Sequence, residues 1–204
     1  MSRTLPDRFY PVVDSAAWVR CLAARGARFA QLRIKSADVA RLRREIAAAL
    51  AVARAAGLAL VVNDHWRLAL ELGADWVHLG QEDLRDADLP ALRRAGLRLG
   101  LSTHSPAELD AALACRPDYV ALGPVFPTRL KVMPWAPQGT PRLGEWKRRI
   151  GPLPLVAIGG ITLQRAAGCF AAGADALAMV GDIVRHAAPE ANIDAWLRAT
   201  RTAA

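Results

Sequence analysis

The chain has 204 residues, a hydrophobic content of 53% and a formal net charge of +8. This length allows one sizeable core, and this apolar content excludes a disordered or linker-dominated protein. Its apolar runs are shorter than the roughly 18 residues that span a bilayer, and the polar start lacks a signal-peptide pattern, so we expect a cytoplasmic protein with no membrane partner.

The positive charge comes mostly from arginine, since only positions 35, 131 and 147 are lysine. The arginines are scattered along helix-like stretches, without a long basic run and without interleaved aromatic residues. An arginine-rich solvated surface is therefore favoured over a nucleic-acid-binding face. Some of these cations are expected to serve anionic substrates.

Short apolar runs of β-type composition alternate with longer stretches of helical period along the whole chain. The strands are predicted over 9–14, 29–34, 58–64, 76–80, 98–103, 119–125, 153–160 and 177–181. The helices are predicted over 15–25, 38–56, 65–73, 88–95, 105–114, 140–150, 162–172 and 191–202. Several of the strands are apolar almost throughout, which is typical of parallel strands covered on both faces.

This repeated strand–helix unit predicts a parallel sheet with right-handed crossovers. A closed (β/α)₈ TIM barrel, one α/β domain over residues 1–204, is the most economical solution. A doubly wound open sheet is the alternative, but such sheets usually have fewer strands, and no GxGxxG pattern follows the first predicted strand. In a barrel, the active face lies at the carboxyl ends of the strands.

Polar side chains end the predicted strand 29–34. Gln31, Arg33 and Lys35 alternate with apolar residues, and period-two alternation places all three on one side, which in a barrel is the interior. Because buried cations are costly without an anionic partner, this ladder favours a phosphate or pyrophosphate site. The alternative is an internal salt-bridge cluster with Asp64 and Asp83.

Two acidic residues lie at neighbouring strand ends. Asn63 and Asp64 end the strand 58–64, and Asp83 follows the strand 76–80. Two carboxylates suit Mg²⁺, which takes one or two of them together with water and substrate phosphate oxygens. Zn²⁺ is disfavoured because no His/Cys group has ligand spacing. Asp64 could alternatively cap the helix that follows it.

The strand 98–103 ends in Ser102, followed by His104 and Ser105. Ser105 is expected to cap the next helix, which leaves Ser102 as the site candidate. We interpret His104 as a structural turn histidine rather than an acid–base catalyst, since no Ser/His/Asp grouping accompanies it.

The loop over 126–139 is long for a compact domain, which indicates a lid or a binding loop. Within it, Thr128 and Lys131 are candidate phosphate partners. Gly160 and Gly181 end the last two predicted strands, where backbone N–H groups of many barrels bind a phosphate.

Taken in order, several of these segments resemble the thiamine phosphate synthase family over nearly the whole chain. The matching segments are QLRIK (31–35), VVNDH (61–65), GADWVHLGQED (73–83), GLSTHS (100–105), ALGPVFPT (121–128), APQG (136–139) and VAIGGIT (156–162). The resemblance implies a (β/α)₈ barrel that joins 4-amino-5-hydroxymethyl-2-methylpyrimidine diphosphate to thiazole phosphate and releases pyrophosphate. It also implies a dissociative reaction, in which the bond to pyrophosphate breaks before the thiazole nitrogen attacks.

The resemblance further implies a role for each candidate residue. Arg33, Ser102 and Lys131 are the catalytic candidates. The pyrimidine diphosphate would be held by Gln31, Arg33, Lys35 and Asn63, Mg²⁺ by Asp64 and Asp83, the pyrophosphate side by Ser102 and Lys131, and the thiazole phosphate by Thr128 and Gly160.

Two positions depart from the family pattern. Leu130 stands at the second threonine of the usual loop, and Gly181 replaces the usual hydroxyl residue after the last strand. Both lie on the thiazole-phosphate side, where affinity or ligand identity could differ.

Two rival functions use the same barrel. A thiazole tautomerase-like isomerase is disfavoured because Pro124 stands where those relatives carry a histidine, and because both metal-type aspartates are present. A non-catalytic barrel that binds a thiamine precursor is disfavoured by the retained interior charges. The expected partners are small phosphorylated molecules rather than nucleic acid, and a homo-oligomer is compatible with the sequence.

Overall fold

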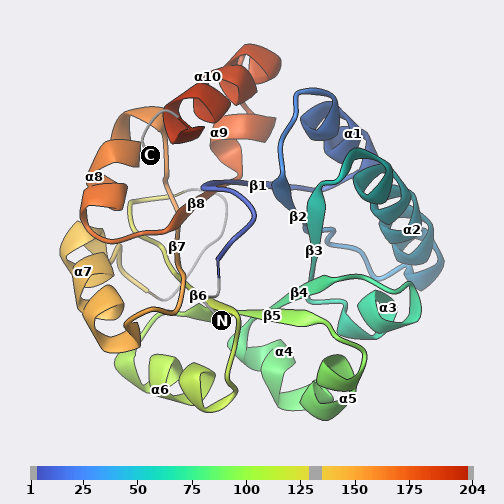
Figure 1. The fold of residues 1–204 in the computed structure, drawn as a ribbon, viewed down its shortest axis with the longest axis horizontal. Coiled ribbons are helices and arrows are strands. Elements are labelled where there is room, and N and C mark those ends of the chain that lie inside the picture. The colour runs from blue at the N-terminus through green and yellow to red at the C-terminus, as the bar shows by residue number, and fades with distance from the viewer. Residues whose placement is uncertain (1–3, 129–134, 202–204) are drawn as a thin grey trace.

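A computed structural model describes residues 4–128 and 135–201. Within these residues eight parallel strands form a closed barrel in chain order, β1 to β8, with β8 pairing back to β1. Helices surround the barrel on its outside (Figure 1). The predicted TIM barrel is therefore confirmed, and the open-sheet alternative is excluded.

Each predicted strand is present, mostly one to three residues shorter at its ends than predicted. The strands are β1 (Phe9–Val13), β2 (Phe29–Leu32), β3 (Ala59–Asn63), β4 (Trp76–Leu79), β5 (Arg98–Thr103), β6 (Tyr119–Leu122), β7 (Leu155–Ile158) and β8 (Ala176–Met179). The helices are α1 (Ala16–Ala24), α2 (Val39–Ala56), α3 (Trp66–Glu71), α4 (Gln81–Asp86), α5 (Leu89–Arg94), α6 (Pro106–Ala114), α7 (Gly139–Ile150), α8 (Ala166–Ala171), α9 (Gly181–Val184) and α10 (Pro189–Arg201), with a 3₁₀ turn η1 (Leu163–Arg165).

The helix prediction was wrong in three places. α4 and α9 were not predicted, and the single helix expected over 162–172 is divided into η1 and α8. α4 buries none of its residues, and α9 has only 4 residues, so neither offers the apolar periodicity on which helix prediction depends.

The strands separate two apolar cores by simple alternation. On β1, Phe9 and Val13 pack outward against the helices, whereas Tyr10 points into the barrel. The interior residues at the strand starts are large, including Phe29, Trp76 and Tyr119, and Leu5 packs against this interior cluster. The N-terminal half of the barrel is therefore filled.

Interior residues nearer the carboxyl ends are small. Ala121, Val156 and Ala178 belong to the same interior cluster and also border a cavity. Because small side chains cannot fill the width of an eight-stranded barrel, the interior opens toward its carboxyl end.

Capping residues fix where many of the helices begin. Ser15, Asp38, Asp88 and Ser105 each accept a hydrogen bond from a backbone N–H in the first turn of α1, α2, α5 and α6. The predicted cap at Ser105 is thus present. It leaves Ser102, three residues earlier, available to the cavity.

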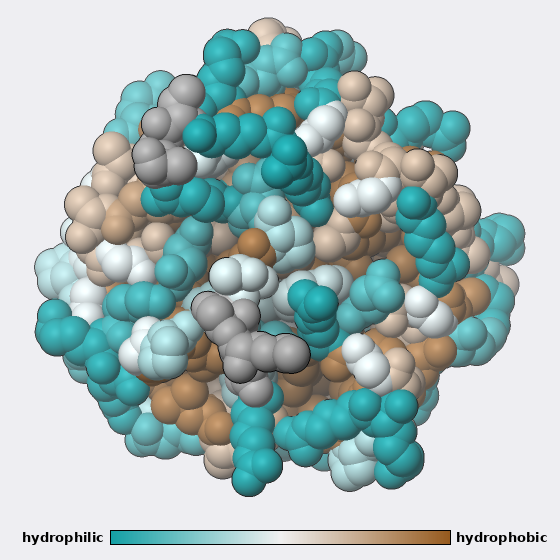
Figure 2. All heavy atoms as spheres, in the orientation of Figure 1, coloured by the Kyte–Doolittle hydropathy of each residue, from teal (hydrophilic) through white to brown (hydrophobic). Residues whose placement is uncertain are grey.

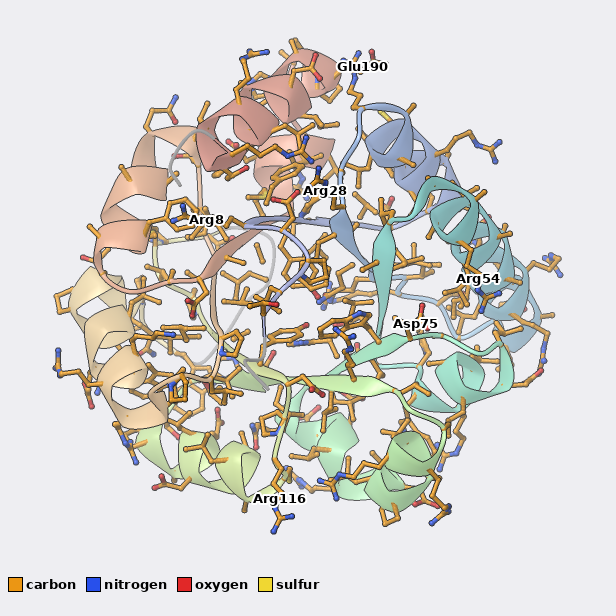
Figure 3. The ribbon with its side chains drawn as sticks, viewed as in Figure 1. Arg8, Arg28, Arg54, Asp75, Arg116 and Glu190 are labelled. Carbon is orange, nitrogen blue, oxygen red and sulfur yellow. The ribbon has the colours of Figure 1, made fainter. Side chains whose placement is uncertain are left out.

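Ion pairs close the helical ring between its first and last members. Arg25, which follows α1, pairs with Glu190 and with Asp194 of α10, the latter at 2.6 Å. Figure 3 shows Glu190 where α10 approaches α1, and Arg54 between α2 and α3. Arg54 donates to the carbonyl oxygens of residues 72 and 73, which directly follow α3.

Hydrophilic side chains on the face shown in Figure 2 are spread around the outline and interleaved with apolar ones. They do not merge into one patch on that face. Among residues 4–128 and 135–201, none of the helices combines the length and the apolar character that crossing a membrane requires.

Candidate active site

A cavity of about 650 Å³ opens at the carboxyl ends of the strands, and residues from all eight strands or the loops after them line it. This is the face where barrel enzymes carry their active sites. Six of the ten candidate site residues border the cavity. They are Gln31, Arg33, Asn63, Ser102, Thr128 and Gly160.

The two acidic candidates lie together. Asp64 follows β3, and Asp83 lies in the first turn of α4, where its carboxyl group acts on that of Asp64. Burial and the neighbouring Asp83 carboxyl raise the pKa of Asp64 to about 6, while the charge of Arg33 acts to lower it.

Of the two aspartates, only Asp83 has a structural role in the described residues. Asp64 does not cap α3. The N-cap of α3 is His65, whose side chain makes no capping hydrogen bond. No ion pair within the described residues joins Arg33 to either aspartate, which counts against the salt-bridge cluster. Asp83 does have a structural role, since its Oδ2 accepts from the Gly80 N–H at 3.2 Å.

The acidic pair has the composition of a magnesium site. In the part of the chain that the structure describes, no cluster of three or more His, Cys, Asp or Glu side chains is assembled. A cation held by Asp64 and Asp83 would therefore need water or substrate oxygens to complete its coordination, as Mg²⁺ commonly does. The adverse carboxyl–carboxyl contact that raises the pKa of Asp64 is the kind of contact that a divalent cation relieves.

Backbone geometry at Asp64 is unusual. Its φ of 64° lies in the left-handed region, which non-glycine residues other than Asn and Asp seldom adopt. Its N–H donates to the carbonyl oxygen of His78 at 2.9 Å, and its own carbonyl accepts from the N–H of Trp66 at 2.8 Å. These bonds hold the residue between β3 and β4.

The two lysine candidates differ from the rest. Lys35 is exposed and does not border the cavity, because β2 ends at Leu32 and the strand alternation is not maintained to position 35. The predicted interior position therefore holds for Gln31 and Arg33 and is wrong for Lys35. Lys131 lies outside the described residues, as does Leu130.

A row of polar side chains crosses the barrel interior along the cavity, and three of its members, Tyr10, Tyr119 and His78, were not predicted as site residues. It runs from Gln31 through Tyr10, Tyr119 and His78 to Ser102, with hydrogen bonds of 2.7–2.9 Å. Burial and the charge of Arg33 lower the pKa of His78 to about 3, and burial raises the pKa values of both tyrosines. All three side chains are therefore neutral near pH 7.

Two glycines after β7 form the opposite side of the cavity. Gly159 and Gly160 have φ values of 95° and 64°. A Cβ at Gly160 would lie 2.6 Å from the carbonyl oxygen of Pro127, so only glycine lets this turn pack against the segment that carries Thr128.

Arginines border this same side of the cavity, and the sequence analysis did not single them out. Arg165 donates to the Gly160 carbonyl at 2.5 Å and lies 4.4 Å from the ring of Phe126. Arg185, just after α9, is exposed and also borders the cavity. Nothing in the sequence distinguishes either from the many solvated arginines of the chain.

Two further polar residues at the cavity have structural partners. Asp182 accepts from the Trp196 indole N–H at 2.7 Å, which ties α9 to α10. His104 directs Nδ1 to Glu108 at 2.8 Å and stacks on Trp135 at 5.6 Å. These contacts agree with the structural interpretation of His104.

Comparison with known proteins gives a consistent picture. The family model described as thiamine monophosphate synthase matches residues 9–183. A thiamine-phosphate synthase of Rhizobium etli is 58% identical over 95% of this chain and 95% of its own length. A thiamine-phosphate synthase of Neisseria meningitidis serogroup A is 49% identical over 94% of this chain and 93% of its own.

A solved structure also matches almost end to end. The thiamine phosphate pyrophosphorylase of Pyrococcus furiosus superposes with a TM-score of 0.84 and 26% identity, covering 98% of each chain.

Proposed function

The chain belongs to the thiamine monophosphate synthase family, and from this premise we propose how its cavity carries out the family's reaction. The protein is a transferase that joins a hydroxymethylpyrimidine diphosphate to a thiazole phosphate, forming thiamine phosphate and pyrophosphate. The observation that supports the assignment of the site is the division of one cavity into two polar sides, one formed by β2–β5 and the other by β6–β8.

The β2–β5 side is proposed to bind the pyrimidine diphosphate. Gln31 and Asn63 would contact the pyrimidine, and Arg33 and Ser102 would contact the diphosphate, because a guanidinium and a hydroxyl both donate to phosphate oxygens. Lys35, which is exposed, is proposed to approach the diphosphate from outside the cavity wall, and Lys131 is proposed as a second cation for the diphosphate.

Asp64 and Asp83 are proposed to hold Mg²⁺. The bound ion would neutralise charge on the diphosphate as it leaves. Arg33 is proposed to act with it, since the positive charge of Arg33 acts to lower the pKa of Asp64.

The chemistry needs no proton transfer by the protein. The bond between the pyrimidine methylene carbon and the diphosphate oxygen breaks, and its electron pair leaves with the diphosphate. The thiazole nitrogen lone pair then forms the new C–N bond. This agrees with a cavity whose buried histidine, His78, is neutral and has both ring nitrogens engaged in hydrogen bonds. The task of the site is orientation and charge stabilisation.

The β6–β8 side is proposed to bind the thiazole phosphate. Thr128 offers a hydroxyl, and the backbone at Gly160 can be approached closely because that residue has no side chain. Arg165 and Arg185 add positive charge where Gly181 lacks the usual hydroxyl. We propose that these arginines compensate for its absence.

The direct test mixes the purified protein with both phosphorylated precursors and Mg²⁺ and measures thiamine phosphate and pyrophosphate by chromatography. Equimolar formation of both products is expected, with strong inhibition by EDTA. An absence of product with Mg²⁺ present would overturn the function, whereas full product with EDTA would overturn only the role of the metal.

A further inference from the structure

The buried row of polar side chains is a continuous hydrogen-bond chain between two cavity-facing groups. Gln31 Nε2 donates to Tyr10 Oη at 2.9 Å, and the two tyrosine hydroxyls lie 2.7 Å apart. His78 then bonds Tyr119 Oη through Nδ1 and Ser102 Oγ through Nε2, each at 2.8 Å. Gln31 and Ser102, at the two ends, border the cavity, and so do Tyr10 and His78.

Counting protons gives the chain one direction. A phenol has a single proton, so Tyr10, which accepts from Gln31, donates its proton to Tyr119. Tyr119 then donates to Nδ1 of His78, which leaves the imidazole proton on Nε2 to be donated to Ser102 Oγ. The opposite direction would require the Gln31 amide to turn its Oε1 toward Tyr10. With Nε2 placed there, the Tyr10 proton would be buried without an acceptor among the described residues, which is costly.

Aromatic packing prevents the members from turning to other partners. The ring of Tyr10 stacks on Phe29 at 3.9 Å, and Tyr119 meets Tyr10 edge-on at 6.0 Å. The imidazole of His78 stacks on Tyr119 at 5.5 Å. A Cβ at Gly100 would lie 2.1 Å from the Tyr119 ring, so this glycine on β5 provides the space for the phenol.

From this geometry we propose that Tyr10, Tyr119 and His78 are positioning residues that fix the hydrogen-bonding polarity of the two ends. The chain holds Gln31 with its Oε1 free to accept and holds Ser102 with its hydroxyl proton free to donate. The inference rests on the proposed function, because an aminopyrimidine offers an amino donor to Gln31, whereas diphosphate oxygens only accept and so need the Ser102 proton.

The chain thereby makes the site selective for a substrate that carries a donor at one end and an acceptor at the other. Without it, the Gln31 amide could rotate and present its NH₂ group, and the Ser102 hydroxyl could turn toward His78. Discrimination against an analogue that lacks the amino group therefore depends on Tyr10, Tyr119 and His78 as well as on Gln31 and Ser102.

The kinetic test compares kcat/KM for the natural pyrimidine diphosphate and for its 4-deamino analogue. Sites that hydrogen-bond a substrate N–H reject the analogue without it by large factors, and we expect a preference of at least about 100-fold in the unaltered enzyme. Tyr10→Phe removes the acceptor for Gln31 and should reduce this preference at least about tenfold. Val61→Ala, an interior change outside the chain, is the matched control and should leave the preference unchanged.

An unchanged preference in Tyr10→Phe, with both substrates slowed equally as in Val61→Ala, would overturn the proposal. Tyr119→Phe should lower kcat more than it raises KM, because the Ser102 donor acts on charge that develops as the diphosphate leaves. If Tyr119→Phe changed KM alone, the proposed role of Tyr119 in directing the Ser102 proton would be contradicted.

A second measurement does not depend on turnover. Nitrogen-15 NMR of the imidazoles at a single pH near 8 should show His78 of the unaltered protein with Nε2 protonated and Nδ1 unprotonated, and should show a mixture of tautomers in Tyr119→Phe. A protonated Nδ1 in the unaltered protein would overturn the chain even if the enzyme is active. The predicted tautomer in a protein that forms no thiamine phosphate would support the chain and overturn the proposed function instead.

Discussion

Replacing Asp64 by Asn tests whether the acidic pair is a binding site maintained at the expense of stability. Asn has almost the same shape and also tolerates the left-handed backbone, whose φ is 64° here. The substitution removes a partly buried charge that lies beside Asp83. Without Mg²⁺ we therefore expect the variant to be more stable than the unaltered protein and much less active.

The structure gives the size of the effect. The pKa of Asp64 is raised from its ordinary value of 3.8 to about 6. One pKa unit corresponds to about 1.4 kcal/mol, so ionisation lowers the free energy of unfolding by up to about 3 kcal/mol. Because the side chain keeps some solvent contact, we take about 1–2 kcal/mol. For a domain of this size the Asn variant should then melt about 2–8 °C higher.

The dependence on pH has a definite sign. The pKa of Asp64 in the folded protein lies above its ordinary value. The stability that the protonated Asp64 contributes is therefore fully present below pH 3.8 and is lost as pH rises through about 6. The difference in melting temperature between Asp64→Asn and the unaltered protein should therefore be absent near pH 3.8 and complete above about pH 6.

Differential scanning calorimetry with and without Mg²⁺ provides the assay. Mg²⁺ should raise the melting temperature of the unaltered protein through binding to the native state and should leave Asp64→Asn unchanged. Asp86→Asn, the same change at an exposed position of α4, serves as control and should shift stability by less than about 0.5 kcal/mol. If Asp64→Asn melts several degrees lower at pH 8 without Mg²⁺, its carboxylate stabilises the fold through Arg33, and the salt-bridge alternative is correct.

Three further predictions concern other parts of the site and core. Calorimetric titration should show Mg²⁺ affinity falling as pH drops through about 6, because Asp64 must release its proton; a constant affinity would contradict this. Arg185→Ala should raise KM for the thiazole phosphate about tenfold with little change in kcat, whereas the exposed Arg44→Ala on α2 should change neither. Thr103→Val should lower the free energy of unfolding, measured in urea, by about 2 kcal/mol, because Thr103 Oγ1 accepts from Trp146 and donates to a backbone carbonyl. Thr103→Ser keeps the hydroxyl and should retain most of this stability.

The barrel could be predicted because its strands are buried on both faces. β2, β6 and β8 are buried at every position, and such runs are recognisable without any tertiary information. α4 could not be predicted, because its sequence QEDLRD has no apolar face and the helix depends on a cap formed by its own Asp83. Asp83 was therefore identified as a site residue but not as a helix residue.

The site could be predicted where polar residues follow apolar strands directly. Gln31, Arg33, Asn63 and Ser102 all border the cavity. Lys35 does not, since alternation holds only while the strand continues, and no sequence feature marks where β2 ends.

The buried tyrosines could not have been predicted as site residues. Tyr10 and Tyr119 lie 109 positions apart and meet only because the closed sheet brings β1 and β6 to opposite walls of one interior. Each alone reads as an ordinary aromatic residue in an apolar strand.

Arg33 explains why the metal and the diphosphate should bind together. Its charge acts on both Asp64 and His78, yet within the described residues it forms no ion pair with Asp64 or Asp83. In the free enzyme the positive charge of Arg33 and the negative charge of the acidic pair are therefore only partly neutralised by each other. A bound cation would neutralise the pair, and a bound diphosphate would neutralise Arg33, so each should favour the other.

Because such coupling is reciprocal, Mg²⁺ should tighten pyrophosphate binding by the same factor by which pyrophosphate tightens Mg²⁺ binding, once complex formation in solution is subtracted. Independent binding would show that Arg33 and the acidic pair serve separate ligands.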